Sequence, residues 1–223
     1  MNIILPGVMR CGTTFLRHYL SRHPSLRPPK RREIEYFSLH YSLGETWYQL
    51  QLGLGGLDKS PNYMANPKVP TRIAADFPDA RVVILLRNPV DRAWSHYRWL
   101  CQTKHVTAPF SDFFRFERLS KGWYSVLRRG HYAEQLSHWF KHIPREQILI
   151  VKSERLWESP YKVYDEIVWF LGLPEFLPKS FRKHGTVKTG GDLSKQDRKI
   201  LATYYGPRNA ALYDLLEKDM GWK

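Results

Sequence analysis

Short apolar runs alternate with longer amphipathic stretches along this chain. Largely apolar runs at residues 3–5, 80–86 and 147–151 predict buried strands of a parallel sheet, which helices cover on both faces. Apolar residues at helical spacing predict helices at residues 15–21, 47–52, 69–77, 89–101, 110–119, 131–142, 161–171, 194–205 and 207–218. This alternation predicts a three-layer α/β fold with a central parallel sheet flanked by helices.

Three stretches lack either pattern and are interpreted as connections. Residues 27–32 are basic and contain prolines, residues 58–63 form a polar loop, and residues 180–192 are basic and rich in glycine. No repeat, low-complexity tract or interdomain linker separates the predicted elements. We therefore expect residues 1–223 to form a single domain.

The first predicted strand runs into a glycine turn that opens a helix. Four residues separate Gly7 from Gly12, and Thr13 and Thr14 begin the helix. Backbone N–H groups in such turns and at helix N-termini bind phosphate groups. The stretch predicts a phosphate cradle made of the amides of Cys11, Gly12 and Thr13 and the hydroxyls of Thr13 and Thr14.

This turn departs from the phosphate loop of nucleotide triphosphatases, which has the pattern G-x-x-x-x-G-K-[ST]. Thr13 occupies the lysine position, and the cation, Arg10, lies two residues before the second glycine. The strand at residues 80–86 ends in Arg87, where a metal-dependent phosphoryl transferase needs an acid. We therefore expect arginine, lysine and hydroxyl groups, without a metal, to neutralise the bound anion.

A second candidate anion site follows the central strand. Arg87 emerges from the strand end, and Ser95 lies two turns along the next helix. Ligands of parallel sheets bind at the carboxyl ends of the strands, so this guanidinium and hydroxyl are placed to hold one phosphate. Arg92, between them, is expected to face the same side or to pair with a surface acid.

The charge and the cysteine content of the chain indicate what kind of partner it binds and whether it contains a disulfide. The chain has 35 Lys and Arg against 21 Asp and Glu, a net charge of +14, which favours anionic partners such as phosphate cofactors or acidic glycans. Its two cysteines, Cys11 and Cys101, are not expected to form a disulfide. The first apolar run is broken at Pro6 and Gly7, so we expect no signal peptide or membrane span and a cytoplasmic protein.

These motifs resemble those of a known enzyme family. Residues 7–14 resemble the loop that binds the 5′-phosphosulfate in sulfotransferases that use 3′-phosphoadenosine 5′-phosphosulfate (PAPS), and residues 87–95 are similar to the family's 3′-phosphate motif. Further segments agree in order and spacing, at residues 32–37, 58–63, 130–132 and 204–213. The resemblance covers nearly the whole chain and is strongest to the heparan-sulfate-type and bacterial members. It implies a P-loop-like fold.

The resemblance implies in-line transfer of a sulfuryl group from PAPS to an acceptor hydroxyl or amine. Arg10 corresponds to the cation at the 5′-phosphate and leaving group, and as a guanidinium it acts by charge alone. Glu33 corresponds to the general base, and Lys59 to a cation that reaches the sulfate or the acceptor. Glu35 is the alternative base.

The family's remaining cofactor contacts are assigned by position. Tyr132, or its neighbour His131, is expected near the adenine. A late basic loop over the cofactor corresponds to residues 182–191, which makes Lys183 and Lys188 candidate ligands.

The acceptor and two other function classes remain open at this point. The basic run at residues 27–32, next to Glu33, favours a carboxylated or sulfated saccharide, with a small-molecule hydroxyl or a peptide tyrosine as alternatives. A P-loop phosphotransferase is disfavoured by the missing lysine and metal-binding acid. A non-catalytic polyanion-binding module fits the charge but has no need of two separate phosphate sites, and no nucleic-acid-binding motif is present.

Overall fold

The computed structural model describes residues 2–27, 29, 31–53, 56–120, 122, 124–181 and 191–222. Four parallel strands form one sheet in the order β2-β1-β3-β4, and β1 pairs through Ile4 with Asp58 on one side and Val82 on the other. The strands are β1 (Ile3–Leu5), β2 (Leu57–Lys59), β3 (Arg81–Leu86) and β4 (Ile148–Lys152). The parallel sheet confirms the predicted α/β architecture.

Helices connect and cover these strands. In chain order they are α1 (Thr13–Leu20), α2 (Gly44–Leu52), α3 (Lys68–Asp76), α4 (Pro89–Thr103), α5 (Phe110–Leu119), α6 (Tyr132–His142), α7 (Arg155–Glu158), α8 (Pro160–Phe170) and α9 (Lys195–Leu216). A π-helical turn, η1 (Tyr36–His40), and short 3₁₀ turns lie between them, the latter at η2 (Tyr41–Leu43), η4 (Tyr63–Ala65), η5 (Arg128–Gly130) and η6 (Arg145–Gln147).

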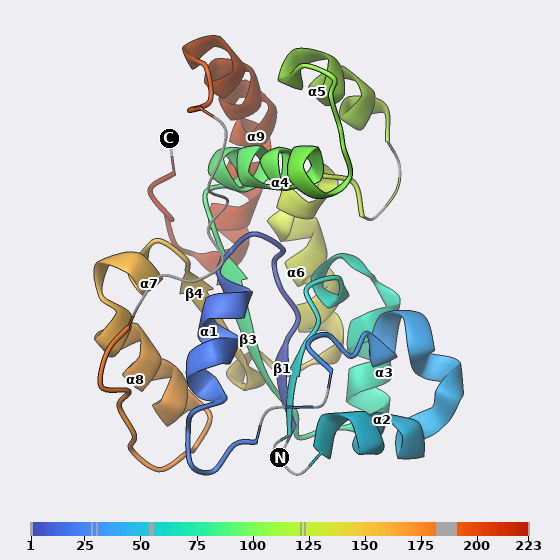
Figure 1. Ribbon diagram of the computed structural model, residues 1–223, viewed down its shortest axis with the longest axis vertical. Helices are drawn as coiled ribbons and strands as arrows, with labels where there is room; N and C mark the ends of the chain where they lie inside the picture. The colour runs from blue at the N-terminus through green and yellow to red at the C-terminus, as the bar shows by residue number, and fades with distance from the viewer. Residues whose placement is uncertain are drawn as a thin grey trace.

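The helices form layers around the sheet (Figure 1). Helices α1, α7 and α8 lie on one face, and α3 and α6 lie on the other. Helices α4, α5 and α9 gather beyond the end of β3 from which α4 starts. Pro89 at the start of α4, together with the Asn88 side chain that accepts the Val90 amide, fixes where this helix begins.

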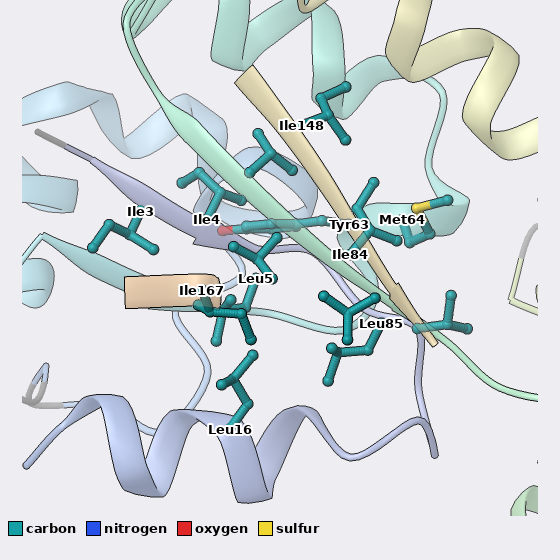
Figure 2. Packing of buried hydrophobic residues seen from close by; sticks show 14 of the residues in the cluster. Ile3, Ile4, Leu5, Leu16, Tyr63, Met64, Ile84, Leu85, Ile148 and Ile167 are labelled. Carbon is teal, nitrogen blue, oxygen red and sulfur yellow. The ribbon is translucent and has the colours of Figure 1, made fainter. Parts of the chain in front are cut away.

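Two apolar clusters hold these layers together. The larger surrounds the sheet, in which every residue of β1 and residues 82–86 of β3 are fully buried. Figure 2 shows Leu16 of α1 pointing toward the sheet beneath Leu5, as the helical spacing of its apolar residues requires. The smaller cluster packs α4, α5 and α9 against each other through Val90, Phe110 and Leu201.

The structure corrects the prediction that residues 58–63 form only a loop. Leu57–Lys59 is the edge strand β2, although Asp58 and Lys59 are charged and lack the apolar pattern of a buried strand. Both side chains are buried because each has hydrogen-bonding partners, hydroxyl groups for Asp58 and the Glu33 carboxylate for Lys59.

Residues 194–205 and 207–218 are also not two helices. Helix α9 runs continuously through Pro207. Proline removes an amide from the helix interior and displaces a carbonyl one turn earlier. Arg208 Nη1 donates to the Tyr204 carbonyl oxygen at 2.6 Å, and its guanidinium lies 4.0 Å from the centre of the Tyr204 ring. These contacts support the helix where the proline weakens it.

No helix in the described part of the chain is both long enough and apolar enough to cross a membrane.

Candidate active site

The turn between β1 and α1 presents an open helix N-terminus. Gly7 is required because a Cβ there would lie 3.1 Å from both Met64 Cβ and the Pro61 carbonyl oxygen. Gly12 is the N-cap of α1 with a φ of 93°, and no side chain caps the helix. The first amides of a helix have no partners within the helix, so those of α1 face the turn, as a phosphate cradle requires.

Cys11 supports this turn from behind. Its amide donates to the Val8 carbonyl oxygen at 3.1 Å, and its own carbonyl accepts the Ser153 hydroxyl at 2.7 Å. Burial raises the pKa of the Cys11 thiol to about 11, so the sulfur stays protonated. The Cys11 amide, predicted to serve the cradle, is thus paired within the turn in this structure.

The two anion motifs meet in space. Arg10 Nε donates to Ser95 Oγ at 3.2 Å, and Arg87 Nη1 donates to the Arg10 carbonyl oxygen at 3.3 Å. Among the ion pairs of the described residues, none joins Arg10 or Arg87 to a carboxylate. Burial, and then Arg87, lower the pKa of Arg10, but a guanidinium remains charged at neutral pH. Two cations thus lie near each other, and no described carboxylate forms an ion pair with either.

Tyr132 belongs to the core. Its ring is only 1% exposed, and its hydroxyl donates to the Arg87 carbonyl oxygen at 2.9 Å. The ring offers no open face for the adenine stacking that was expected of it. Tyr132 instead fixes the main chain at the point where Arg87 leaves β3.

Glu33 and Lys59 form an ion pair at the mouth of the site. Lys59 Nζ donates to Glu33 Oε1. The Lys59 side chain is 1% exposed and that of Glu33 is 40% exposed. A buried ammonium group therefore binds a carboxylate that remains accessible to solvent. Burial lowers the pKa of the Lys59 ammonium, and the Glu33 charge partly offsets that effect.

Glu35 does not lie where an extended segment would place it. Its φ of 55° is left-handed, and it ends the segment directly before the π-helical turn η1. Its side chain is buried and accepts hydrogen bonds from Asn62 Nδ2, at 2.8 Å, and from the Ser38 hydroxyl. Burial raises the pKa of Glu35. Burial and these two hydrogen-bond donors therefore distinguish Glu35 from Glu33.

Four of the predicted site residues, Arg10, Thr13, Thr14 and Glu33, border one open cleft of about 810 Å³, a size typical of small-ligand sites, whereas Lys59, Arg87 and Ser95 are not among its lining residues. It is lined by Met9, Arg10, Thr13, Thr14, Arg31, Arg32, Glu33, Pro61, Asn62 and Trp99. The structure thus brings the cradle threonines, the Arg10 guanidinium and the Glu33 carboxylate to the same cavity.

Sequence reasoning missed a buried layer next to this cleft. Arg129 Nη2 donates to Asn62 Oδ1 at 2.6 Å, and burial lowers the pKa of Arg129 to about 10. Arg92 is fully buried, donates to the Val126 carbonyl oxygen and lies 3.5 Å from His96 Nδ1. Arg92 therefore neither faces the anion site nor pairs with a surface acid. No spacing in the sequence signals this layer, because it joins helix α4 to turns that are far away in the sequence, at residues 62 and 126–129.

Two further predicted cofactor ligands, Lys183 and Lys188, lie outside the described residues. In the part of the chain that is described, no three His, Cys, Asp or Glu residues are grouped so as to hold a metal ion.

Comparison with known proteins identifies the family. Residues 1–187 match the model described as "Sulfotransferase domain". The human protein "Heparan sulfate glucosamine 3-O-sulfotransferase 3B1" is 29% identical over 98% of this chain and 64% of its own length. The chain thus spans less than two thirds of that relative, and 61% of the human 3A1 protein.

Solved structures of sulfotransferases share this fold. A sulfotransferase from Alicyclobacillus acidocaldarius has a TM-score of 0.83 at 26% identity, with 98% of this chain and 96% of that chain covered. Mouse sulfotransferase SULT7A1, solved in complex with PAP, shares the fold at a TM-score of 0.56 and 16% identity, over 91% of this chain and 63% of that chain. The family model, the relatives and the fold confirm the resemblance drawn from residues 7–14 and 87–95: this chain belongs to the sulfotransferase domain family.

Proposed function

We propose that this enzyme transfers a sulfuryl group from PAPS to a hydroxyl or amine of a saccharide, with Glu33 as the general base. The observation that carries the proposal is the Arg10–Ser95 hydrogen bond, which joins the two anion-binding motifs beside the cleft that holds Glu33. A cofactor with anionic groups at its 5′ and 3′ positions needs two such motifs.

The donor groups in the site fit this cofactor. The uncapped N-terminus of α1 and the hydroxyls of Thr13 and Thr14 suit the 5′-phosphosulfate, and Arg87 with Ser95 suits the 3′-phosphate. Arg10 and Arg87 have no carboxylate partner among the described ion pairs, so each has donors available for an anionic ligand. PAPS itself supplies the activated sulfuryl group.

The protein's contribution to the transfer is electrostatic. In such displacements negative charge spreads over the equatorial oxygens and the leaving group, and fixed cations stabilise it. Arg10 is held in place by Ser95, and its main chain is held by Arg87, so the guanidinium is oriented before reaction. It cannot serve as a proton donor at neutral pH, and we assign it a role by charge alone.

Glu33 is the better placed of the two candidate bases. It borders the cleft and its carboxylate is 40% exposed, whereas Glu35 is buried and both its oxygens accept hydrogen bonds. Lys59 binds one oxygen of Glu33 and leaves the other for the acceptor proton. A positioned base of this kind contributes roughly 10²–10⁴-fold to the rate.

The cleft wall supports an anionic saccharide as the acceptor. Arg31 and Arg32 line it beside Glu33, and Trp99 adds an aromatic surface. The Arg31 guanidinium is fixed, since its Nε donates to Gln51 Oε1 at 3.1 Å and it lies over the Trp47 ring. Relatives named as heparan sulfate glucosamine 3-O-sulfotransferases favour the same acceptor class.

Calorimetric titration with PAP tests the donor site. We expect micromolar binding by the wild type and a loss of about 10²-fold in Arg87→Ala, because charge-assisted hydrogen bonds are lost. Arg81→Ala is the matched control, since Arg81 begins β3, whereas Arg87 directly follows the last residue of that strand. Failure of the wild type to bind PAP would refute the proposal.

An acceptor panel tests the second half of the proposal. Transfer from labelled PAPS to heparan sulfate, to small-molecule hydroxyls and to tyrosine peptides is compared for the wild type and Glu33→Gln. Activity on heparan sulfate that depends on Glu33 supports the assignment, whereas activity confined to another acceptor contradicts the saccharide.

A further inference from the structure

Asp58 is a fully buried carboxylate that no described ion pair joins to a cation. Its Oδ1 accepts the hydroxyl proton of Ser60 at 2.7 Å, and its Oδ2 accepts that of Tyr63 at 2.8 Å. An ionised carboxylate can only accept hydrogen bonds, so it fixes the direction of both hydroxyls. Figure 2 shows the Tyr63 ring inside the apolar cluster that surrounds the sheet.

The same two hydroxyl oxygens accept backbone amides from the segment that follows Glu33. Ser60 Oγ accepts the Ile34 amide at 3.1 Å and the Glu35 amide at 3.0 Å. Tyr63 Oη accepts the Phe37 amide at 3.2 Å. One buried carboxylate thus directs two hydroxyls that together satisfy three amides.

We propose that Asp58 is a positioning residue, which holds the main chain next to Glu33 through Ser60 and Tyr63 and thereby sets where the Glu33 carboxylate lies. The proposal rests on the proposed function only in that Glu33 serves as the base. Moving this segment would leave buried amides without acceptors, and that penalty restricts the segment to one conformation.

Strand β2 therefore fixes the base in two ways. Lys59 binds the Glu33 side chain, while its neighbours Asp58 and Ser60 hold the main chain that follows Glu33. Alternation along a strand sends Lys59 to one side and Asp58 and Ser60 to the other. Catalytic groups need this kind of support, because a misplacement of about 1 Å can cost roughly 10²-fold in rate.

Amide hydrogen exchange measured by NMR tests the contact network without any substrate. In Ser60→Ala we expect the Ile34 and Glu35 amides to exchange about tenfold faster, and in Tyr63→Phe the Phe37 amide. Amides of β3 such as Val83 should keep their wild-type rates. Tyr164→Phe is the matched control, since this buried hydroxyl donates to the Tyr19 carbonyl oxygen instead. Unchanged exchange at Ile34 and Glu35 in Ser60→Ala would overturn the proposal.

Asp58→Asn separates the carboxylate from the hydroxyls. An amide side chain keeps a single acceptor oxygen, so one hydroxyl loses its direction and exchange rises at Phe37 or at the Ile34 and Glu35 pair. Wild-type rates at all three amides in this variant would show that Asp58 does not direct the hydroxyls.

Turnover then tests the positioning role. On heparan sulfate, Ser60→Ala and Asp58→Asn should lower kcat by about tenfold or more, with PAP affinity unchanged, because neither residue borders the cleft. Faster exchange with wild-type kcat would refute positioning of the base. Faster exchange in an enzyme that does not bind PAP would refute the proposed function and leave the network intact.

Discussion

Arg10 Nε donates to Ser95 Oγ across 85 positions of sequence, from the turn after β1 to the second turn of α4. The contact joins two motifs that were each predicted from local spacing. It makes the orientation of the Arg10 guanidinium depend on a side chain from the other motif.

Ser95→Ala should weaken PAP binding by about tenfold, because a ligand hydroxyl and the acceptor that orients Arg10 are lost together. Calorimetry gives the affinity. Ser137→Ala is a suitable control, since this exposed hydroxyl only donates to the Ala133 carbonyl oxygen within α6. Equal affinities of the Ser95 variant and the wild type would argue against a 3′-phosphate site at this position.

Arg10→Lys should retain a cation but lose the Nε–H that binds Ser95. We expect kcat to fall by roughly tenfold, against roughly 10²–10³-fold in Arg10→Ala, which removes the charge that stabilises the leaving group. Single-turnover transfer to heparan sulfate measures both. Similar rates in the lysine and alanine variants would mean that charge at this position does not drive the reaction.

Glu33→Gln should lower kcat by roughly 10²–10⁴-fold with little change in PAP affinity, because the substitution removes a proton acceptor and keeps the shape. Glu35→Gln provides the comparison at the second carboxylate. A larger loss in kcat for the Glu35 variant than for Glu33→Gln would transfer the role of base to Glu35.

The lowered pKa of the His96 imidazole leads us to expect that the protein loses stability as the pH falls below neutral. Burial, and then Arg92, Arg129 and Arg10, lower its pKa from 6.5 to about 2. The unfolded chain therefore takes up a proton below pH 6.5 that the folded protein does not. The stability that a neutral His96 provides is present above pH 6.5 and is lost as the pH falls, by up to about 1.4 kcal/mol per pH unit.

Urea unfolding between pH 5 and 8 measures this effect. The wild type should lose about 2 kcal/mol more than His96→Gln between pH 6.5 and 5. His142→Gln, at the end of α6, is the control, because it removes a histidine at a different position. Parallel stability curves for the wild type and His96→Gln would show that His96 titrates normally in the folded protein.

The sequence predicted those features that depend on neighbouring residues. The apolar runs gave β1, β3 and β4, and the spacing of Gly7, Gly12, Arg87 and Ser95 placed both anion motifs at strand ends. These elements can be predicted because the apolar pattern of a strand and the residues of a turn are both visible in a short stretch of sequence.

The features that the sequence did not predict depend on contacts between distant segments. The charged strand β2 is buried because residues 33 and 63 supply partners for Lys59 and Asp58. Glu35 takes a left-handed conformation where its amide meets Ser60, and Asn62 is held by Arg129, 67 positions away. No local pattern specifies such pairs, since each depends on how the layers pack.

Among the described residues, those that line the cleft all lie between Met9 and Trp99 in the sequence. The groups that brace it from behind, Arg129, Tyr132 and Ser153, come from beyond the connection at residues 104–109. A polypeptide divided at that connection would carry these cleft-lining residues in one fragment and the groups that brace the site in the other. Cofactor affinity would then report directly on the reassembly of the two halves.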